Sequence, residues 1–162
     1  MSITEKAVTP QNQLPNEALR IVSNGFFAYL ATAEENCNPH ITTMFYIWDE
    51  ETGRVFLITG ERTRKAKNIK KNDRVSVTID ERDPESPAGN RGVMIRGRAR
   101  LISVEEMGDV LMNFYLEKYL HFLQEGWALG SRVVIEVTPR IISYWKGIHF
   151  HRWENPAFMK RG

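Results

Sequence analysis

Short strand-like segments, separated by turns, occupy most of this sequence and restrict the folds open to it. Apolar runs rich in β-branched and aromatic side chains cover residues 26–33, 40–48, 54–59 and 74–80. Runs of this composition favour strands, and the Asn-, Pro- and Gly-containing stretches between them favour turns. We interpret the first three strands as a meander. Consecutive strands joined by short turns favour an antiparallel barrel over a doubly wound parallel sheet.

Two helices and further strands are also predicted, which gives six or seven strands in total. A strand is predicted over 93–102, where Gly97 indicates a bulge or a close approach of another backbone, and the last pair over 132–138 and 141–146 is interrupted by Pro139. Helical spacing of apolar residues predicts a helix over 15–24 and a longer one from Ser103 to about Gln124, opened by a capping box of Ser103 and Glu106.

Size and charge narrow the class of protein. The 162 residues, 42% of them hydrophobic, fit one folded domain over 1–162, of which residues 1–13 are expected to be flexible. A net charge of +2 argues against a nucleic-acid or membrane partner, and no apolar run approaches the roughly 20 residues that span a bilayer. A soluble, cytoplasmic protein is expected. Cys37 is the only cysteine, which excludes an internal disulfide.

The segment over residues 54–72 carries the clearest chemical signal. A strand ends at Gly60, and a basic helix that begins near Thr63 follows it. Free N–H groups at a helix start, together with arginine and lysine side chains, can hold a phosphate. A charge run on a short helix is also typical of a solvated face, and we assign Lys70 and Lys71 to such a face.

No enzyme signature accompanies this segment. The sequence lacks a glycine-rich nucleotide fingerprint, a phosphate-loop lysine motif, a zinc-protease helix and a serine nucleophile elbow. His149 and His151 would share one face of a strand and could bind metal or haem, but a third ligand is missing, so no metal site is predicted. No catalytic residue is assigned.

The order of motifs resembles the flavin-binding split-barrel family, the group of pyridoxamine 5′-phosphate oxidase and its relatives. The matching motifs are Leu-Ala-Thr from residue 30, Pro-His-Ile-Thr-Thr-Met-Phe-Tyr from 39, Val-Phe-Leu-Ile-Thr from 55, Thr-Arg-Lys-Ala-Lys-Asn-Ile from 63 and Asn-Asp-Arg-Val-Ser-Val from 72. The resemblance resumes at 92–101 and 135–147, and so covers most of the chain.

This resemblance implies a mainly β (α+β) fold, an antiparallel six-stranded split β-barrel with flanking helices. It implies a homodimer with FMN at the subunit interface. Arg64 and Lys65 would hold the FMN phosphate, the strand from Thr42 would run along the flavin ring, and Trp145 would contact the flavin from the partner chain. The full set of predicted cofactor-binding residues is Thr42, Thr43, Met44, Phe45, Leu57, Ile58, Thr59, Thr63, Arg64, Lys65 and Trp145.

The sequence also departs from the family pattern, which leaves the activity open. Gly92 replaces a glutamine that contacts flavin in the oxidase, and the oxidase's C-terminal Arg-x-His substrate motif has no faithful copy. An FMN-dependent oxidoreductase acting on a small molecule is the first prediction. The alternatives are a deazaflavin-dependent reductase of the same fold, a flavin- or haem-binding stress protein without turnover, and a nucleic-acid-binding barrel using Arg62, Arg64, Lys65, Lys67, Lys70 and Lys71.

Overall fold

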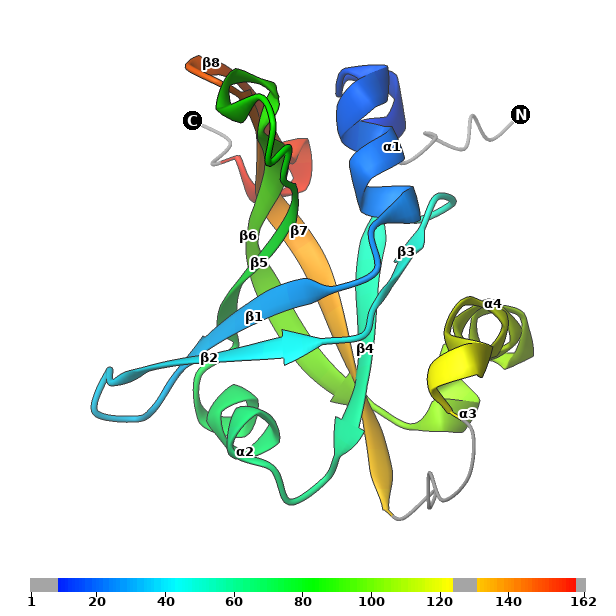
Figure 1. Cartoon of the computed structure of the whole chain (residues 1–162). Helices are drawn as coiled ribbons and strands as arrows, with labels where there is room; N and C mark the ends of the chain where they lie inside the picture. The colour runs from blue at the N-terminus through cyan, green and yellow to red at the C-terminus, as the bar shows by residue number, and fades with distance from the viewer. Residues whose placement is uncertain (1–8, 124–130, 160–162) are drawn as a thin grey trace, which may run out of the picture.

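A computed structural model, which describes residues 9–123 and 131–159, contains one antiparallel sheet curved into a split barrel (Figure 1). The strands are β1 (Ala28–Ala33), β2 (Pro39–Met44), β3 (Ile47–Asp49), β4 (Arg54–Gly60), β5 (Arg74–Glu81), β6 (Arg91–Ile102), β7 (Arg132–Lys146) and β8 (His149–Glu154). Their order is β2-β1-β5-β6-β7-β4-β3, with β8 beside β7. The predicted fold class is confirmed.

Helices close the barrel at its two ends and along one side (Figure 1). They are α1 (Asn16–Asn24), α2 (Arg64–Lys71), α3 (Val104–Met107) and α4 (Asp109–Tyr119), with 3₁₀ turns η1 (Pro10–Asn12), η2 (Pro87–Gly89), η3 (Leu120–Phe122) and η4 (Pro156–Phe158). Helices α1 and α2 lie at opposite ends of the barrel. Of the segment expected to be flexible, residues 1–8 lie outside the described residues, and Pro10–Asn12 form η1.

Two apolar clusters hold these elements together. Inward-facing side chains of the strands form the barrel core, in which Leu30 and Val77 lie opposite each other on β1 and β5. A second cluster lies between α4 and the outer face of β4. Strand β4 contributes side chains to both clusters, because Leu57 points into the barrel and Ile58 points towards α4. Burial on both faces explains why β4 is a continuous apolar run instead of an alternating one.

The predicted strand over 40–48 is wrong, because the chain leaves one part of the sheet and enters another there. Strand β2 pairs only with β1, whereas β3 pairs with β4, so the first three predicted strands do not form a meander. At the break, the backbone of Tyr46 makes hydrogen bonds with a side chain instead of with a neighbouring strand. The hydroxyl of Tyr119 on α4 accepts from the Tyr46 N–H at 2.9 Å and lies 2.7 Å from its carbonyl.

Two further predictions need revision, and one strand was missed. The predicted long helix is broken at Gly108, whose φ of +88° lies in the left-handed region that favours glycine. The start of the helix is as predicted, because the Ser103 hydroxyl caps α3 by accepting from the Glu106 N–H at 3.0 Å. Strand β7 continues through Pro139. Pro139 lies opposite Gly97, next to the point where the register between β6 and β7 shifts. Because the regular ladder of hydrogen bonds is interrupted there, the N–H that proline lacks costs no ladder bond. Strand β8 was not predicted.

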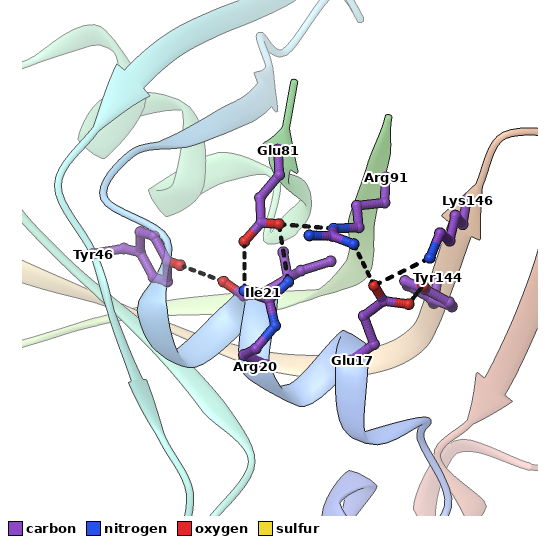
Figure 2. Close-up of polar contacts among 8 residues, drawn as sticks. All are labelled: Glu17, Arg20, Ile21, Tyr46, Glu81, Arg91, Tyr144 and Lys146. Atoms are coloured by element: carbon purple, nitrogen blue, oxygen red, sulfur yellow. Dashed lines mark hydrogen bonds and ion pairs between the residues drawn. The ribbon is translucent and has the colours of Figure 1, made fainter. Parts of the chain in front are cut away.

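A polar network fixes α1 to the ends of β5, β6 and β7 (Figure 2). Arg20 makes two 3.0 Å hydrogen bonds to the Glu81 carboxylate, and Arg91 donates to the same carboxylate at 2.8 Å and also to Glu17. Glu17 accepts in addition from the Tyr144 hydroxyl. The pKa of the Glu17 carboxyl is lowered mainly by that hydroxyl, and the pKa of Glu81 mainly by Arg20.

We expect this network to make stability depend on acidic pH. A carboxyl group whose pKa is lowered by folding stabilises the folded state above its ordinary pKa of 4.5, and that contribution is lost as the pH falls through the lower folded value. Urea unfolding at pH 6, 5, 4 and 3 should therefore show a smaller loss of stability with acid in Glu81→Gln than in the wild type. Glu51→Gln, in an exposed turn, is the control. Equal acid sensitivity in both variants would contradict the assignment.

Candidate functional site

The turn between β4 and α2 leaves the start of the helix without a side-chain cap. Thr63 occupies the N-cap position, but its hydroxyl donates to the Gly60 carbonyl at 2.9 Å and lies 3.3 Å from the Thr59 hydroxyl. The first-turn N–H groups of α2 therefore keep their capacity to bind an anion. Buried Ala66 and Ile69 fix the inner face of the helix against the barrel.

The two basic residues that open α2 differ in environment. Arg64 is exposed and donates to Glu34 on the β1–β2 turn at 2.7 Å. Lys65 is half-buried, and the loss of water around its ammonium lowers its pKa. No carboxylate in residues 9–123 and 131–159 pairs with Lys65. A partly desolvated cation without a counter-charge favours the approach of an anion.

The rest of the basic helix faces solvent. Arg62, Lys67, Lys70 and Lys71 are exposed and, with Arg64, line an open hollow beside the β1–β2 turn. Lys71 pairs there with Glu35 at 2.6 Å. The acidic residues of that turn, Glu34 and Glu35, offset part of the positive charge. This arrangement fits the solvated face that the sequence suggested for Lys70 and Lys71 and is less suited to a nucleic-acid backbone.

A cavity of about 320 Å³ lies between β2 and β4, which are not paired with each other. It is lined by Phe27, Thr43, Met44, Phe45, Ile58, Thr59, Tyr115 and Arg132. Five of these residues, from Thr43 to Phe45 and from Ile58 to Thr59, belong to the predicted cofactor-binding set. A second hollow lined by Gly60, Glu61, Arg62, Thr63 and Ser131 follows directly along β4, since Gly60 pairs with Arg132. The structure thus brings the β2, β4 and α2 segments of the prediction to one side of the barrel.

The remaining predicted residues lie elsewhere. Thr42 faces the opposite side of β2 from Thr43, with its hydroxyl 3.1 Å from the His40 ring. The Leu57 side chain is fully buried in the barrel core, so only its backbone can contact a ligand outside. Trp145 lies near the far end of β7, next to Tyr144 of the α1 network.

Gly92 and Trp145 explain one departure from the family pattern. They pair across β6 and β7, and a Cβ atom on Gly92 would lie 2.9 Å from the Trp145 ring nitrogen and 3.0 Å from the Ile79 carbonyl. Any side chain at position 92 would displace this ring, because both contacts are shorter than ordinary van der Waals contact. About 13 strand residues separate Trp145 from Arg132, or about 40 Å along β7 at ~3.3 Å each. Trp145 and the cavity residue Arg132 therefore lie near opposite ends of β7.

An aromatic cluster forms one wall of the cavity and was missed from the sequence. Phe45 stacks on Tyr119 at 4.3 Å and lies 5.5 Å from Phe27. Phe26 and Phe122 extend the cluster, and Lys118 lies 4.1 Å above the Tyr46 ring, where burial lowers the pKa of its amine to about 8. These residues come from segments far apart in sequence, so no local pattern could have joined them.

Two other predictions concern metals and membranes. In the described part of the chain, no three His, Cys, Asp or Glu side chains gather as metal ligands. His149 and His151 share an exposed face of β8, where His151 lies 3.3 Å from the Gln13 carbonyl. No helix among the described residues combines the length and apolar character needed to cross a bilayer.

Comparison with known proteins identifies relatives over most of the chain. The family model described as "Pyridoxamine 5′-phosphate oxidase" matches residues 14–146. A 5a,11a-dehydrotetracycline/5a,11a-dehydrooxytetracycline reductase of Streptomyces rimosus is 35% identical over 79 residues, which are 47% of this chain and 55% of the reductase. The chain thus spans little more than half the length of that relative.

Solved structures share the fold at lower sequence identity. A haem-binding protein from Mycobacterium smegmatis superposes with a TM-score of 0.71 at 17% identity, over 88% of this chain and 58% of that one. A FAD-binding protein from Mesorhizobium loti gives 0.65 at 18%, over 81% and 94%. An F420 reductase gives 0.61 at 23%, over 80% and 98%.

Proposed function

The chain belongs to the pyridoxamine 5′-phosphate oxidase family of split-barrel flavin-binding proteins, and from this premise we propose that it binds FMN and acts as an oxidoreductase on a small molecule. The observation that carries the proposal is the placement of the uncapped, basic start of α2 beside the cavity between β2 and β4. A phosphate at the helix start and a planar ring in the cavity match the two ends of FMN.

In this arrangement each part of the chain has a separate role. Lys65 and the first N–H groups of α2 would hold the phosphate, while Thr43 and Thr59 offer hydroxyls to the polar edge of the ring. Phe45 supplies an apolar wall that excludes water. Bound FMN would supply the electron transfer itself, so an absent catalytic triad is expected.

We also propose a homodimer in the cytoplasm, with the cofactor at the subunit interface. The outer face of β1, β2 and β6 carries the exposed apolar side chains Tyr29, Ile41 and Met94, which a second copy would cover. The distance of Trp145 from the cavity at α2 is in keeping with its delivery by the partner chain.

A deazaflavin-dependent reductase is the second candidate. It is favoured by the similarity to an F420 reductase structure. The basic hollow around Arg64 and Lys67 extends beyond the α2 start and would suit a coenzyme with a longer anionic tail. The haem-binding structure supports a third, weaker alternative through the exposed histidines of β8.

Titration of the ligand-free protein separates these candidates. FMN, the deazaflavin coenzyme and haemin are added in turn, and binding is followed by visible absorbance and by quenching of flavin fluorescence. We expect saturable, one-to-one FMN binding at micromolar or tighter affinity. Saturation with the deazaflavin but not with FMN would transfer the proposal to the second candidate, and binding of haemin alone would refute both.

A further inference from the structure

A further hollow, outside the proposed FMN site, is lined by arginine side chains from three neighbouring strands. It has a volume of about 610 Å³ on the outer face of the sheet, and β5, β6 and β7 lie side by side there (Figure 1). Its arginines are Arg74, Arg96, Arg98 and Arg140. Half-buried Ala31, Ala33 and Ser76 contribute small side chains to the lining. It shares no lining residue with the cavities at α2. We call it the arginine groove.

A bulge on β7, opposite Arg96 and Gly97, helps to build this groove, and its extra residue is Arg140. A Cβ atom on Gly97 would lie 2.3 Å from the Thr138 carbonyl, so only glycine permits this approach of β6 to β7. The register shifts between Arg96 and Gly97, and both Arg96 and Arg98 line the groove, while Ile95 and Ala99 remain in the core. A bulge is a known device for redirecting side chains. Here the redirected side chain is that of Arg140, which has no partner on β6, and it joins Arg96 and Arg98 on the same face of the sheet.

The charges in the groove are mostly uncompensated. Arg74 and Arg98 are direct cross-strand neighbours on β5 and β6, a like-charge pairing that destabilises a sheet. Asp73 pairs with Arg98. Within residues 9–123 and 131–159, no carboxylate pairs with Arg74, Arg96 or Arg140. Three clustered guanidinium groups without counter-ions leave a strong local positive potential over small, sterically open residues.

We propose that the arginine groove binds a compact polyanion, a molecule or substituent that carries at least two adjacent phosphate or carboxylate groups. The planar fork of arginine binds both groups with two parallel hydrogen bonds, and the volume lies within the range of small-molecule sites. A ligand charge of about −3 would neutralise the three unpaired arginines. A diphosphate has the required size and charge.

Isothermal titration calorimetry with sodium pyrophosphate tests this proposal. The titration uses the full chain at low ionic strength, both without FMN and saturated with FMN, so that a pyrophosphate bound at α2 is displaced in the second case. We expect binding in both cases. The double substitution Arg96→Gln/Arg140→Gln should weaken it by about tenfold or more, as expected when charge-assisted hydrogen bonds are lost.

Arg82→Gln is the control for the loss of one surface charge, because Arg82 is an exposed arginine paired with Asp80 and lies outside the groove. It should change the affinity less than about twofold. Equal weakening by both variants would show a net-charge effect and overturn the proposal, as would full affinity in the double variant or competition of FMN for all pyrophosphate sites.

A second copy of the chain is the other possible occupant of the groove, because Arg96 and Arg98 share a face of β6 with Met94, which the proposed homodimer would cover. The acidic loop of that copy carries Asp83 and Glu85. Sedimentation velocity separates the cases. If the double substitution dissociates an oligomer and the wild type shows no pyrophosphate binding, the groove is a contact between copies and the proposal fails. Failure of FMN binding alone leaves the pyrophosphate result for the FMN-free protein intact, so the two proposals can fail independently.

Discussion

Replacement of Lys65 by methionine is expected to lower the affinity for FMN by about 10- to 100-fold, the range of a lost hydrogen bond between charged groups. Lys65 is half-buried and lacks a carboxylate partner among the described residues, so its ammonium is available to a phosphate without the loss of an existing ion pair. Methionine retains an unbranched apolar stem of similar length, which limits the effect on packing. Fluorescence titration with FMN measures the change.

Two further variants separate this role from general electrostatics. Lys67→Met removes the same charge from an exposed position on the same helix, and we expect a change of less than about threefold. Arg64→Met should have an intermediate effect, because Arg64 must first leave Glu34 before it contacts a ligand. The interpretation is wrong if Lys67→Met matches Lys65→Met, or if riboflavin, which lacks the phosphate, loses affinity in Lys65→Met to the same extent as FMN.

The sequence predicted those parts of the fold that local chemistry determines. The strand that ends at Gly60 and the basic helix after it occur as expected, since a glycine at the end of an apolar run and helix formers beyond it act over a few residues. A bulge or a close approach at Gly97 was also predicted, and the structure has the Thr138 carbonyl against Gly97 and a register shift beside it.

Long-range partners account for what local patterns missed. Residues 40–48 form a uniformly strand-like run, and the break at Tyr46 exists because Tyr119, 73 residues later, bonds its backbone. Pro139 reads as an interruption in the sequence alone, whereas in the structure β7 bulges at the next residue, Arg140, and pairs with β6 on both sides of it. A proline does not break a strand where its partner's register has already shifted.

The candidate site shows the same division. Its β2, β4 and α2 segments could be assigned from motifs, whereas Phe27, Tyr115 and Arg132 join the cavity only through the barrel's closure. Leu57 shows why a cofactor-binding role cannot be transferred from the family by position alone. Adjacent strand residues face opposite sides of the sheet, so Leu57 points into the core while Ile58 faces the cavity.

The Tyr119→Phe variant is expected to lose about 2–3 kcal/mol of unfolding free energy, because a buried N–H is left without a partner. The Tyr119 hydroxyl accepts from the Tyr46 N–H and lies within 2.8 Å of the carbonyls of Phe26 and Tyr46. The Tyr46 carbonyl keeps the Lys118 ammonium as a donor at 3.1 Å, but its N–H has no second acceptor among the described residues. Urea unfolding followed by circular dichroism gives the difference.

Tyr29→Phe is the matched control, since Tyr29 is 42% exposed and should change stability by less than about 0.5 kcal/mol. The ring that stacks on Phe45 at 4.3 Å remains in Tyr119→Phe, so any loss of FMN affinity in that variant reports a shift of the backbone at residues 45–46 and not a missing wall. We expect such a loss to be a few-fold, because Met44 and Phe45 directly precede the released backbone. Equal stability of the two variants would mean that the separation of β2 from β3, and with it the cavity, is maintained by side-chain packing alone.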